Sequence, residues 1–257
     1  MAELAQKTIK SKAYAIFELC LSLIVIVGVA IILFLLTVML AAVADAILAH
    51  WPLSRPLEER VRSAISNRNS EALTYLGLAA SSLTYLAVGL AVLLVARLRG
   101  GADWLDLVAW RPWVSWLRRR SFWLLVGATL AYSFAADFAI AYFSPDTRNW
   151  LTTPKDGAGA ALLALLAVVF APVTEELVFR GWIFTNLRRD FSFVTTVLIS
   201  SAVFAGMHYD STHVYALAVF PVGLALGALR ELTGSVKSSI ALHALNNFIA
   251  VCLSFPD

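Results

Sequence analysis

Long apolar segments recur from one end of the sequence to the other, and they limit the chain to the folds of membrane proteins. A transmembrane helix needs about 20 consecutive, mostly apolar residues. Seven segments approach or exceed that length, at about 16–48, 73–96, 122–143, 158–187, 192–208, 214–229 and 235–253. The sequence therefore predicts an all-α protein, a polytopic membrane helical bundle of about seven transmembrane helices that forms a single membrane domain over residues 1–257.

The composition agrees with an integral, multi-pass membrane protein that contacts the lipid bilayer directly. Hydrophobic residues make up 60% of the chain and charged residues 14%, whereas soluble domains carry about 25% charged residues. The formal net charge of +3 is too small to indicate a nucleic-acid partner. Cys20 and Cys252 lie far apart in apolar segments, so neither a disulfide framework nor a CxxC metal site is expected.

The positive charges predict which way the chain crosses the membrane. Lysines precede the first apolar segment, which is much longer than the 7–15 apolar residues of a signal peptide and is expected to stay as a transmembrane helix. With a cytoplasmic N-terminus, 13 of the 20 Lys and Arg residues fall inside, six fall outside and Arg180 lies within the bilayer. The positive-inside rule favours this orientation. Short loops without eukaryotic targeting signals suggest the inner (plasma) membrane of a prokaryote.

The segment 97–120 differs from its apolar neighbours. It interleaves six arginines with Trp104, Trp110, Trp113 and Trp116. Basic residues mixed with tryptophan are typical of an amphipathic helix lying in the membrane interface. A loop rich in membrane-anchoring residues is the other interpretation.

Three charges interrupt the apolar segment 158–187, namely Glu175, Glu176 and Arg180. A charge at bilayer depth costs several kcal/mol, so these side chains must face a protein interior or a wet cavity. Glu176 and Arg180 are four residues apart, which places them on one helix face as an ion pair. Glu175 is rotated by about 100° around the helix axis from Glu176, so it presents a separate carboxylate. A purely structural ion pair is the alternative interpretation.

Two later apolar segments carry single polar features. His208 ends the fifth segment, and His243 and Asn247 lie four residues apart in the seventh, on one helix face. Either histidine alone is more typical of a packed or interfacial residue than of a catalyst. Together with Glu175, they supply a carboxylate, two imidazoles and an amide, which are the groups of a hydrolase without a covalent nucleophile.

In such a hydrolase Glu175 accepts a proton from water as a general base, and His208 orients the same water. His243 and Asn247 can donate hydrogen bonds to the oxygen that becomes negative in a tetrahedral intermediate. The sequence contains no HExxH, GxSxG or P-loop motif. A zinc site formed by Glu175, His208 and His243 is the second possibility.

Taken in order, Glu175-Glu176-x-x-x-Arg180, Phe204-x-x-x-His208 and His243-x-x-x-Asn247 resemble the motifs of type II CAAX prenyl endopeptidases. These belong to the wider CAAX-protease and bacteriocin-processing (CPBP, Abi) family of intramembrane proteases. The resemblance implies an active site in the bundle cavity, with Glu175 and His208 activating water and His243 and Asn247 forming the oxyanion hole. It implies that Glu176 and Arg180 hold the site together. It covers a catalytic core at 158–254, after N-terminal spans and the amphipathic segment at 1–157.

The resemblance implies an intramembrane endopeptidase that cleaves a membrane-associated or prenylated (CAAX-type) peptide or protein by glutamate-activated water. No cofactor is required in that mechanism, and a zinc-dependent, metalloendopeptidase-like variant is the alternative. The family also contains non-catalytic scaffolds and bacteriocin-immunity proteins. A transporter with buried charges on its path is the remaining hypothesis.

Overall fold

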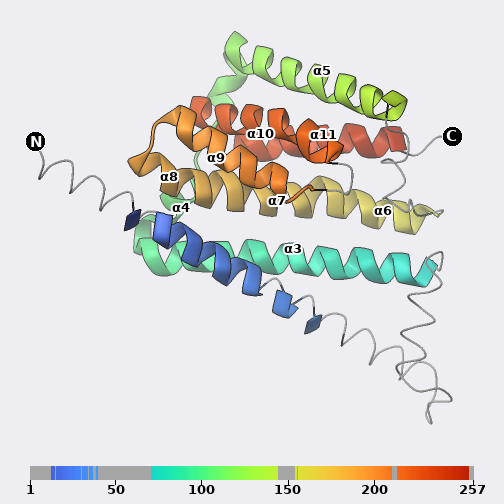
Figure 1. The fold of residues 1–257 in the computed structure, drawn as a ribbon, viewed down its shortest axis with the longest axis horizontal. Helices are drawn as coiled ribbons and strands as arrows, with labels where there is room; N and C mark the ends of the chain where they lie inside the picture. Colours follow the sequence, from blue (N-terminus) through green and yellow to red (C-terminus); the bar gives the residue numbers. More distant parts are fainter. Residues whose placement is uncertain are drawn as a thin grey trace, which may run out of the picture.

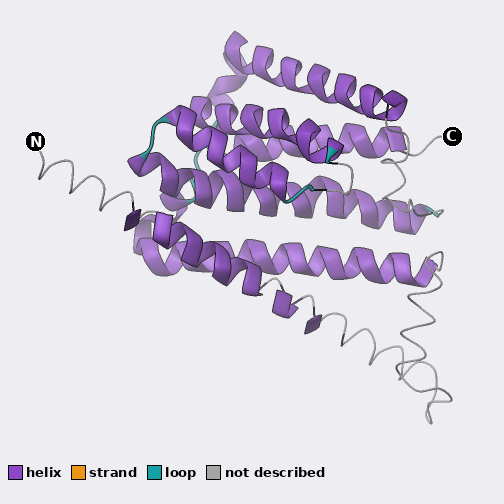
Figure 2. Cartoon of the chain, viewed as in Figure 1, coloured by secondary structure: helices purple, strands orange, loops and turns teal. Residues whose placement is uncertain are grey.

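The computed structural model is a bundle of helices, and it describes residues 71–143, 154, 156–209 and 213–254 together with most of 13–39. Figures 1 and 2 show the long helices lying side by side, and no strand occurs within these described ranges. The predicted all-α membrane bundle is therefore confirmed. The lysines that precede the first apolar segment lie outside the described residues.

The helices follow one another with short connections. The long ones begin with α3 (Glu71–Gly100) and α5 (Arg120–Phe143). A continuous helical segment then comprises α6 (Gly157–Leu165), η4 (Leu166–Phe170), α7 (Ala171–Glu176), η5 (Leu177–Ile183) and α8 (Phe184–Asp190). The chain ends with α9 (Phe193–Gly206), α10 (Val214–Thr233) and α11 (Val236–Ser254).

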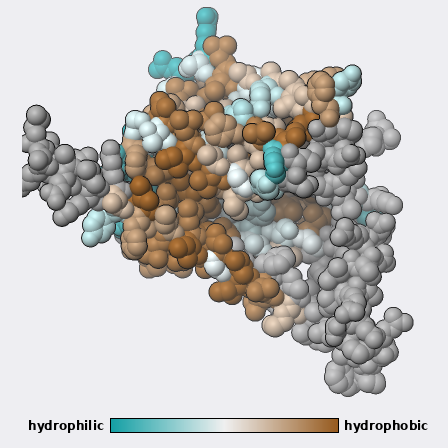
Figure 3. Space-filling view, viewed as in Figure 1, coloured by the Kyte–Doolittle hydropathy of each residue, from teal (hydrophilic) through white to brown (hydrophobic). Residues whose placement is uncertain are grey.

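Six helical segments in the described part are long and apolar enough to cross a membrane: Ile16–Leu33, Gly77–Leu107, Arg120–Phe143, Gly157–Asp190, Val214–Thr233 and Val236–Ser254. Their outward surface is apolar, as Figure 3 shows for one face and as the exposure of Leu94, Phe138 and Leu217 illustrates. A protein with such a surface is an integral, multi-pass membrane protein, because exposed side chains of this kind are suited to lipid.

Helix α9 differs from the prediction of a full span at 192–208. It has 14 residues, which rise about 21 Å, whereas the hydrocarbon core is about 30 Å thick. Its start is fixed by Ser192, whose hydroxyl accepts a hydrogen bond from the backbone N–H of Thr195. The helix ends at Gly206, so His208 lies just beyond its last turn.

The segment 97–120 is not one amphipathic helix. After α3 ends at Gly100, it forms η1 (Gly101–Asp103), α4 (Trp104–Leu107) and η2 (Val114–Arg118). Val108 and Ala109 are buried between α4 and η2. The backbone N–H of Val236 donates to the carbonyl of Ala109, at 2.9 Å, so this segment closes one end of the bundle against the α10–α11 turn.

The packing of α10 on α9 depends on two glycines. A Cβ at Gly223 would lie 3.1 Å from Cβ of Ser201, and a Cβ at Gly227 would lie 2.6 Å from Cγ2 of Val197. Neither helix could approach so closely with a larger residue on α10. This close contact places the Gly223 carbonyl beside the buried charges of the 157–190 segment.

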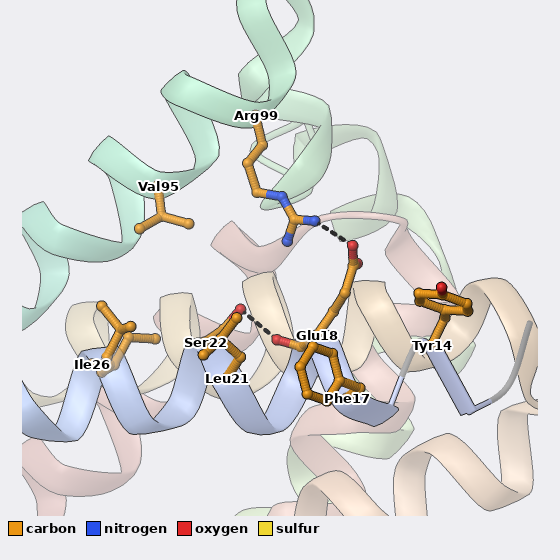
Figure 4. Close-up of a pocket in the computed structure, with 9 residues that line it drawn as sticks. Tyr14, Phe17, Glu18, Leu21, Ser22, Ile26, Val95 and Arg99 are labelled. Carbon is orange, nitrogen blue, oxygen red and sulfur yellow. Dashed lines mark hydrogen bonds and ion pairs between the residues drawn. The ribbon is translucent and has the colours of Figure 1, made fainter.

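A pocket of about 380 Å³ opens between the N-terminal helix and α3. Figure 4 shows apolar side chains along it and an ion pair at one end, where Arg99 lies 2.7 Å from Glu18. None of the polar residues predicted for the active site lines this pocket.

Candidate active site

The charges lie near the middle of the continuous helical segment Gly157–Asp190. Asp156 caps its beginning by accepting hydrogen bonds from the backbone N–H groups of Ala158 and Gly159, at 2.9 and 3.0 Å. The short helix α7 is flanked by two π-helical stretches, η4 and η5. Such stretches are rare and occur frequently at functional sites, because they change the direction in which following side chains point.

Glu176 and Arg180 form the ion pair expected from their spacing, and both side chains are fully buried. Arg180 Nη1 donates to Glu176 Oε1 at 2.8 Å, and Nη2 donates to the Gly223 carbonyl of α10 at 2.9 Å. The guanidinium carbon lies 4.3 Å from the centre of the Phe204 ring of α9. Arg180 thus joins its own helical segment to α9 and α10.

His243 of α11 is buried and oriented by the same carboxylate. Its Nδ1 lies 3.0 Å from Glu176 Oε1. A carboxylate oxygen only accepts hydrogen bonds, so Nδ1 carries the proton. The ring packs edge-on against Phe204, with centroids 5.7 Å apart. The other nitrogen, Nε2, faces Glu175 and lies 3.8 Å from its Oε2.

His208 is oriented in a similar way from the end of α9. Its Nδ1 lies 2.8 Å from the backbone carbonyl of Phe204, which can only accept, so Nδ1 is the donor. The ring also contacts the Phe204 ring, at 4.6 Å between centroids. Its Nε2 lies 3.9 Å from Glu175 Oε2. In the neutral imidazole this nitrogen is unprotonated and can accept a hydrogen bond.

Glu175 is the residue on which the two histidines converge. Its Oε1 accepts a hydrogen bond from the Tyr85 hydroxyl of α3, at 2.8 Å. Its Oε2 is buried, and no described residue forms a hydrogen bond with it. The separations of 3.8 and 3.9 Å from the two imidazole nitrogens exceed hydrogen-bond length. They allow a single oxygen atom to lie within hydrogen-bond distance of Oε2 and of either nitrogen.

Asn247 lies one helical turn beyond His243, but its amide is engaged elsewhere. Nδ2 donates to the backbone carbonyl of Ala167 in η4, at 2.8 Å. This hydrogen bond runs to the 157–190 segment and not to the Glu175 carboxylate. One N–H of the amide remains for a second acceptor, because an asparagine amide carries two donors.

Tyr85 is the site residue that reasoning from the sequence missed. It lies in an apolar segment of α3, 90 residues before Glu175, and no motif or spacing singles it out. Its backbone carbonyl also accepts a hydrogen bond from the Thr174 hydroxyl, at 2.8 Å. The only sequence signal is a polar atom in a membrane span, which many tyrosines share.

The geometry also bears on the zinc site considered for Glu175, His208 and His243. Throughout the described ranges, no group of three or more His, Cys, Asp or Glu side chains is arranged to hold a metal ion. The zinc site stays a prediction, and the mechanism proposed for the site uses the side chains alone.

Comparison with known proteins identifies the C-terminal part of the chain. Residues 157–249 match the family model described as type II CAAX prenyl endopeptidase Rce1-like. No curated protein and no solved structure matches the chain. The matched range contains Glu175, Glu176, Arg180, His208, His243 and Asn247, and Tyr85 lies outside it. Residues 157–249 are therefore similar to the type II CAAX prenyl endopeptidases that the model describes as Rce1-like.

Proposed function

We propose that this protein is an intramembrane endopeptidase that hydrolyses a peptide bond of a membrane-associated or prenylated (CAAX-type) substrate. The observation that carries the proposal is the environment of Glu175 Oε2. This oxygen is buried, has no hydrogen-bond partner among the described residues, and lies 3.9 and 3.8 Å from Nε2 of His208 and of His243. A water between these groups is positioned and activated by them.

Glu175 is the general base in this mechanism. Oε2 takes one proton of the water, and the unprotonated Nε2 of His208 accepts a hydrogen bond from the other, which orients the attacking oxygen. The water oxygen bonds to the carbonyl carbon and gives a tetrahedral intermediate. Glu175 then returns its proton to the leaving nitrogen as the carbon–nitrogen bond breaks. The products are one peptide with a new carboxyl group and one with a new amine.

His243 and Asn247 stabilise the oxyanion. Nδ1–H of His243 is engaged by Glu176, so Nε2 can donate to an oxyanion only when the ring carries both protons. The free N–H of the Asn247 amide supplies a second donor. Donors aimed at developing charge are the usual large contribution to such catalysis.

The buried pair of Glu176 and Arg180 supports this chemistry indirectly, by orienting His243. Glu176 Oε1 accepts from both Arg180 and His243, at 2.8 and 3.0 Å. The pair therefore fixes the tautomer of His243 and the direction of its Nε2. Neither Glu176 nor Arg180 needs to touch the substrate to do this.

We further propose that the site lies in a prokaryotic inner membrane with the basic end of the bundle facing the cytoplasm. The ends of α3, α8 and α10 that carry arginines lie at the end of the bundle where the described N-terminal helix begins (Figure 1). Positive charges favour the cytoplasmic face. The substrate is a peptide or lipidated protein that reaches the site from the membrane.

The test is hydrolysis of a quenched fluorescent farnesylated peptide by the purified protein in proteoliposomes, beside the same peptide without the farnesyl group. Glu175→Gln should abolish cleavage. Glu231→Gln is the matched control, because Glu231 forms an exposed ion pair with Arg188 on the surface. Cleavage by Glu175→Gln at the wild-type rate refutes the assignment. A folded wild-type protein that cleaves neither peptide favours a non-catalytic scaffold or immunity protein.

A further inference from the structure

The hydroxyl of Tyr85 donates to Oε1 of Glu175 across the interface between α3 and α7. Tyr85 lies outside residues 157–249, so the catalytic domain is completed by a helix of the N-terminal half. We propose that Tyr85 is a positioning residue, which holds the Glu175 carboxylate so that Oε2 alone faces the two imidazoles. This inference rests on the proposed function for its effect on catalysis.

The position of Tyr85 is fixed by contacts that involve its backbone and its neighbours. The hydroxyl of Thr174, the residue before Glu175, donates to the Tyr85 carbonyl at 2.8 Å. Four residues along α3, a Cβ at Gly89 would lie only 3.0 Å from Oγ1 of the same threonine. Because Gly89 has no side chain, α3 approaches α7 closely at this level of the bundle. The phenol is therefore presented to Glu175 by two helices in direct contact.

The hydrogen bond distinguishes two otherwise equivalent oxygens. The terminal torsion of a glutamate is broad and roughly two-fold, so an unrestrained carboxylate exchanges its oxygens. Tyr85 engages Oε1 at 2.8 Å, whereas Oε2 has no hydrogen-bond partner in the described part of the chain. A hydrogen bond from a hydroxyl to a carboxylate is charge-assisted and is stronger than a neutral one. Oε2 is thereby kept in the orientation from which it can accept a proton.

Tyr85→Phe in the full-length protein removes this hydrogen bond and keeps the ring. The lost hydrogen bond is charge-assisted, and without it the carboxylate can turn away from the water, so kcat should fall about 10- to 100-fold. KM should stay within about twofold, because Tyr85 holds the base and not the substrate. Tyr132→Phe is the matched control. Its hydroxyl donates to the Ala218 carbonyl, at 3.1 Å, away from Glu175, and the variant should keep the wild-type kcat.

A second measurement does not depend on peptidase activity. Dicyclohexylcarbodiimide enters membranes and modifies protonated carboxyl groups, and mass spectrometry of the full-length protein reports its addition at Glu175. The Tyr85 hydrogen bond occupies Oε1 of Glu175 and restrains the carboxyl group, and its loss leaves both oxygens free to react. Glu175 should therefore be modified several-fold faster in Tyr85→Phe than in the wild type or in Tyr132→Phe.

The two measurements separate the two proposals. Slower turnover with an unchanged KM and faster modification of Glu175 supports the positioning role. A second outcome is that the wild-type protein has no peptidase activity, while Glu175 is still modified faster in Tyr85→Phe than in the wild type. This outcome supports the contact between Tyr85 and Glu175 and refutes the proposed function. Modification of Glu175 at the wild-type rate in Tyr85→Phe overturns the inference, whatever happens to kcat.

Discussion

Nδ1 of His243 lies 3.0 Å from Oε1 of Glu176, and the same oxygen accepts a hydrogen bond from Arg180 at 2.8 Å. One carboxylate oxygen thus connects α11 to a guanidinium that also contacts α9 and α10. Because all three side chains are buried, the loss of any one leaves another polar group without its partner. The arrangement makes the stability of the bundle depend on the same residues that orient the candidate active site.

Arg180→Ala is expected to reduce the yield of folded protein much more than Glu175→Ala. Removing one partner of a buried ion pair costs about 3–5 kcal/mol, because the other charge is left uncompensated. Glu175 is slightly exposed and has Tyr85 as its hydrogen-bond partner, so its loss leaves no buried charge unpaired. Size-exclusion profiles and melting temperatures in detergent measure the difference. Equal folded yields of the two variants would contradict this expectation.

Gly227→Ala is expected to destabilise the contact between α9 and α10. Its Cβ would lie 2.6 Å from Cγ2 of Val197, and overpacking of this kind costs about 1–3 kcal/mol. The double variant Gly227→Ala with Val197→Ala should recover part of the lost melting temperature. Gly127→Ala on α5 is the control, because nothing lies within 4 Å of the added carbon. A Gly227→Ala protein as stable as the Gly127→Ala protein would be inconsistent with the observed packing.

Asn247→Asp is expected to be as inactive as Asn247→Ala. The amide nitrogen donates to the Ala167 carbonyl, and a carboxylate supplies no such donor and would repel the carbonyl oxygen. Loss of one oxyanion donor costs about 100- to 1,000-fold in kcat. Asn186→Ala is the control, because its amide donates to the Trp182 carbonyl at 2.8 Å, outside the site. An Asn247→Asp enzyme with near wild-type kcat would show that the amide donor is not used.

Chelators are expected to leave peptidase activity unchanged. The described residues include no group of three His, Cys, Asp or Glu side chains arranged to hold a metal ion. Activity in 1,10-phenanthroline should equal that in buffer, and elemental analysis should find less than one zinc per active protein. Activity that is lost with the chelator and restored by zinc would instead assign Glu175, His208 and His243 as ligands.

The proposed orientation predicts which side of the membrane each end of the 157–190 segment reaches. In a variant without Cys20 and Cys252, Gly157→Cys should react with a membrane-impermeant maleimide in intact cells. Arg189→Cys should react only after the membrane is opened. The two positions lie at opposite ends of one continuous helical segment. The reverse pattern of labelling would place the basic end outside.

Some of these relationships follow from the sequence because they are local. The pairing of Glu176 with Arg180 depends only on helix geometry, and the observed distance is 2.8 Å. The orientation of His208 by the Phe204 carbonyl, four residues earlier, is of the same kind. The six helical segments in the described part of the chain that are long and apolar enough to cross a membrane likewise follow from runs of apolar residues.

The parts that could not be predicted depend on how helices pack. The contact of Tyr85 with Glu175 requires the exact approach of α3 to α7, which no spacing in the chain encodes. The sequence does not indicate that α9 ends at Gly206, because the apolar segment continues to Met207. The acceptor of Asn247 lies in the π-helical η4, and an apolar run does not reveal a change from α- to π-helical geometry.

The short length of α9 has a consequence for the substrate of the proposed peptidase. A helix of 14 residues rises about 21 Å, less than the hydrocarbon core of about 30 Å, so in the proposed mechanism water would attack inside the membrane and not at its surface. A peptide bond that arrives there within an intact helix has its carbonyl already engaged. Under the proposed function, a substrate would therefore have to reach this depth as an unwound segment, and the ease of its local unwinding would select the bond that is cut.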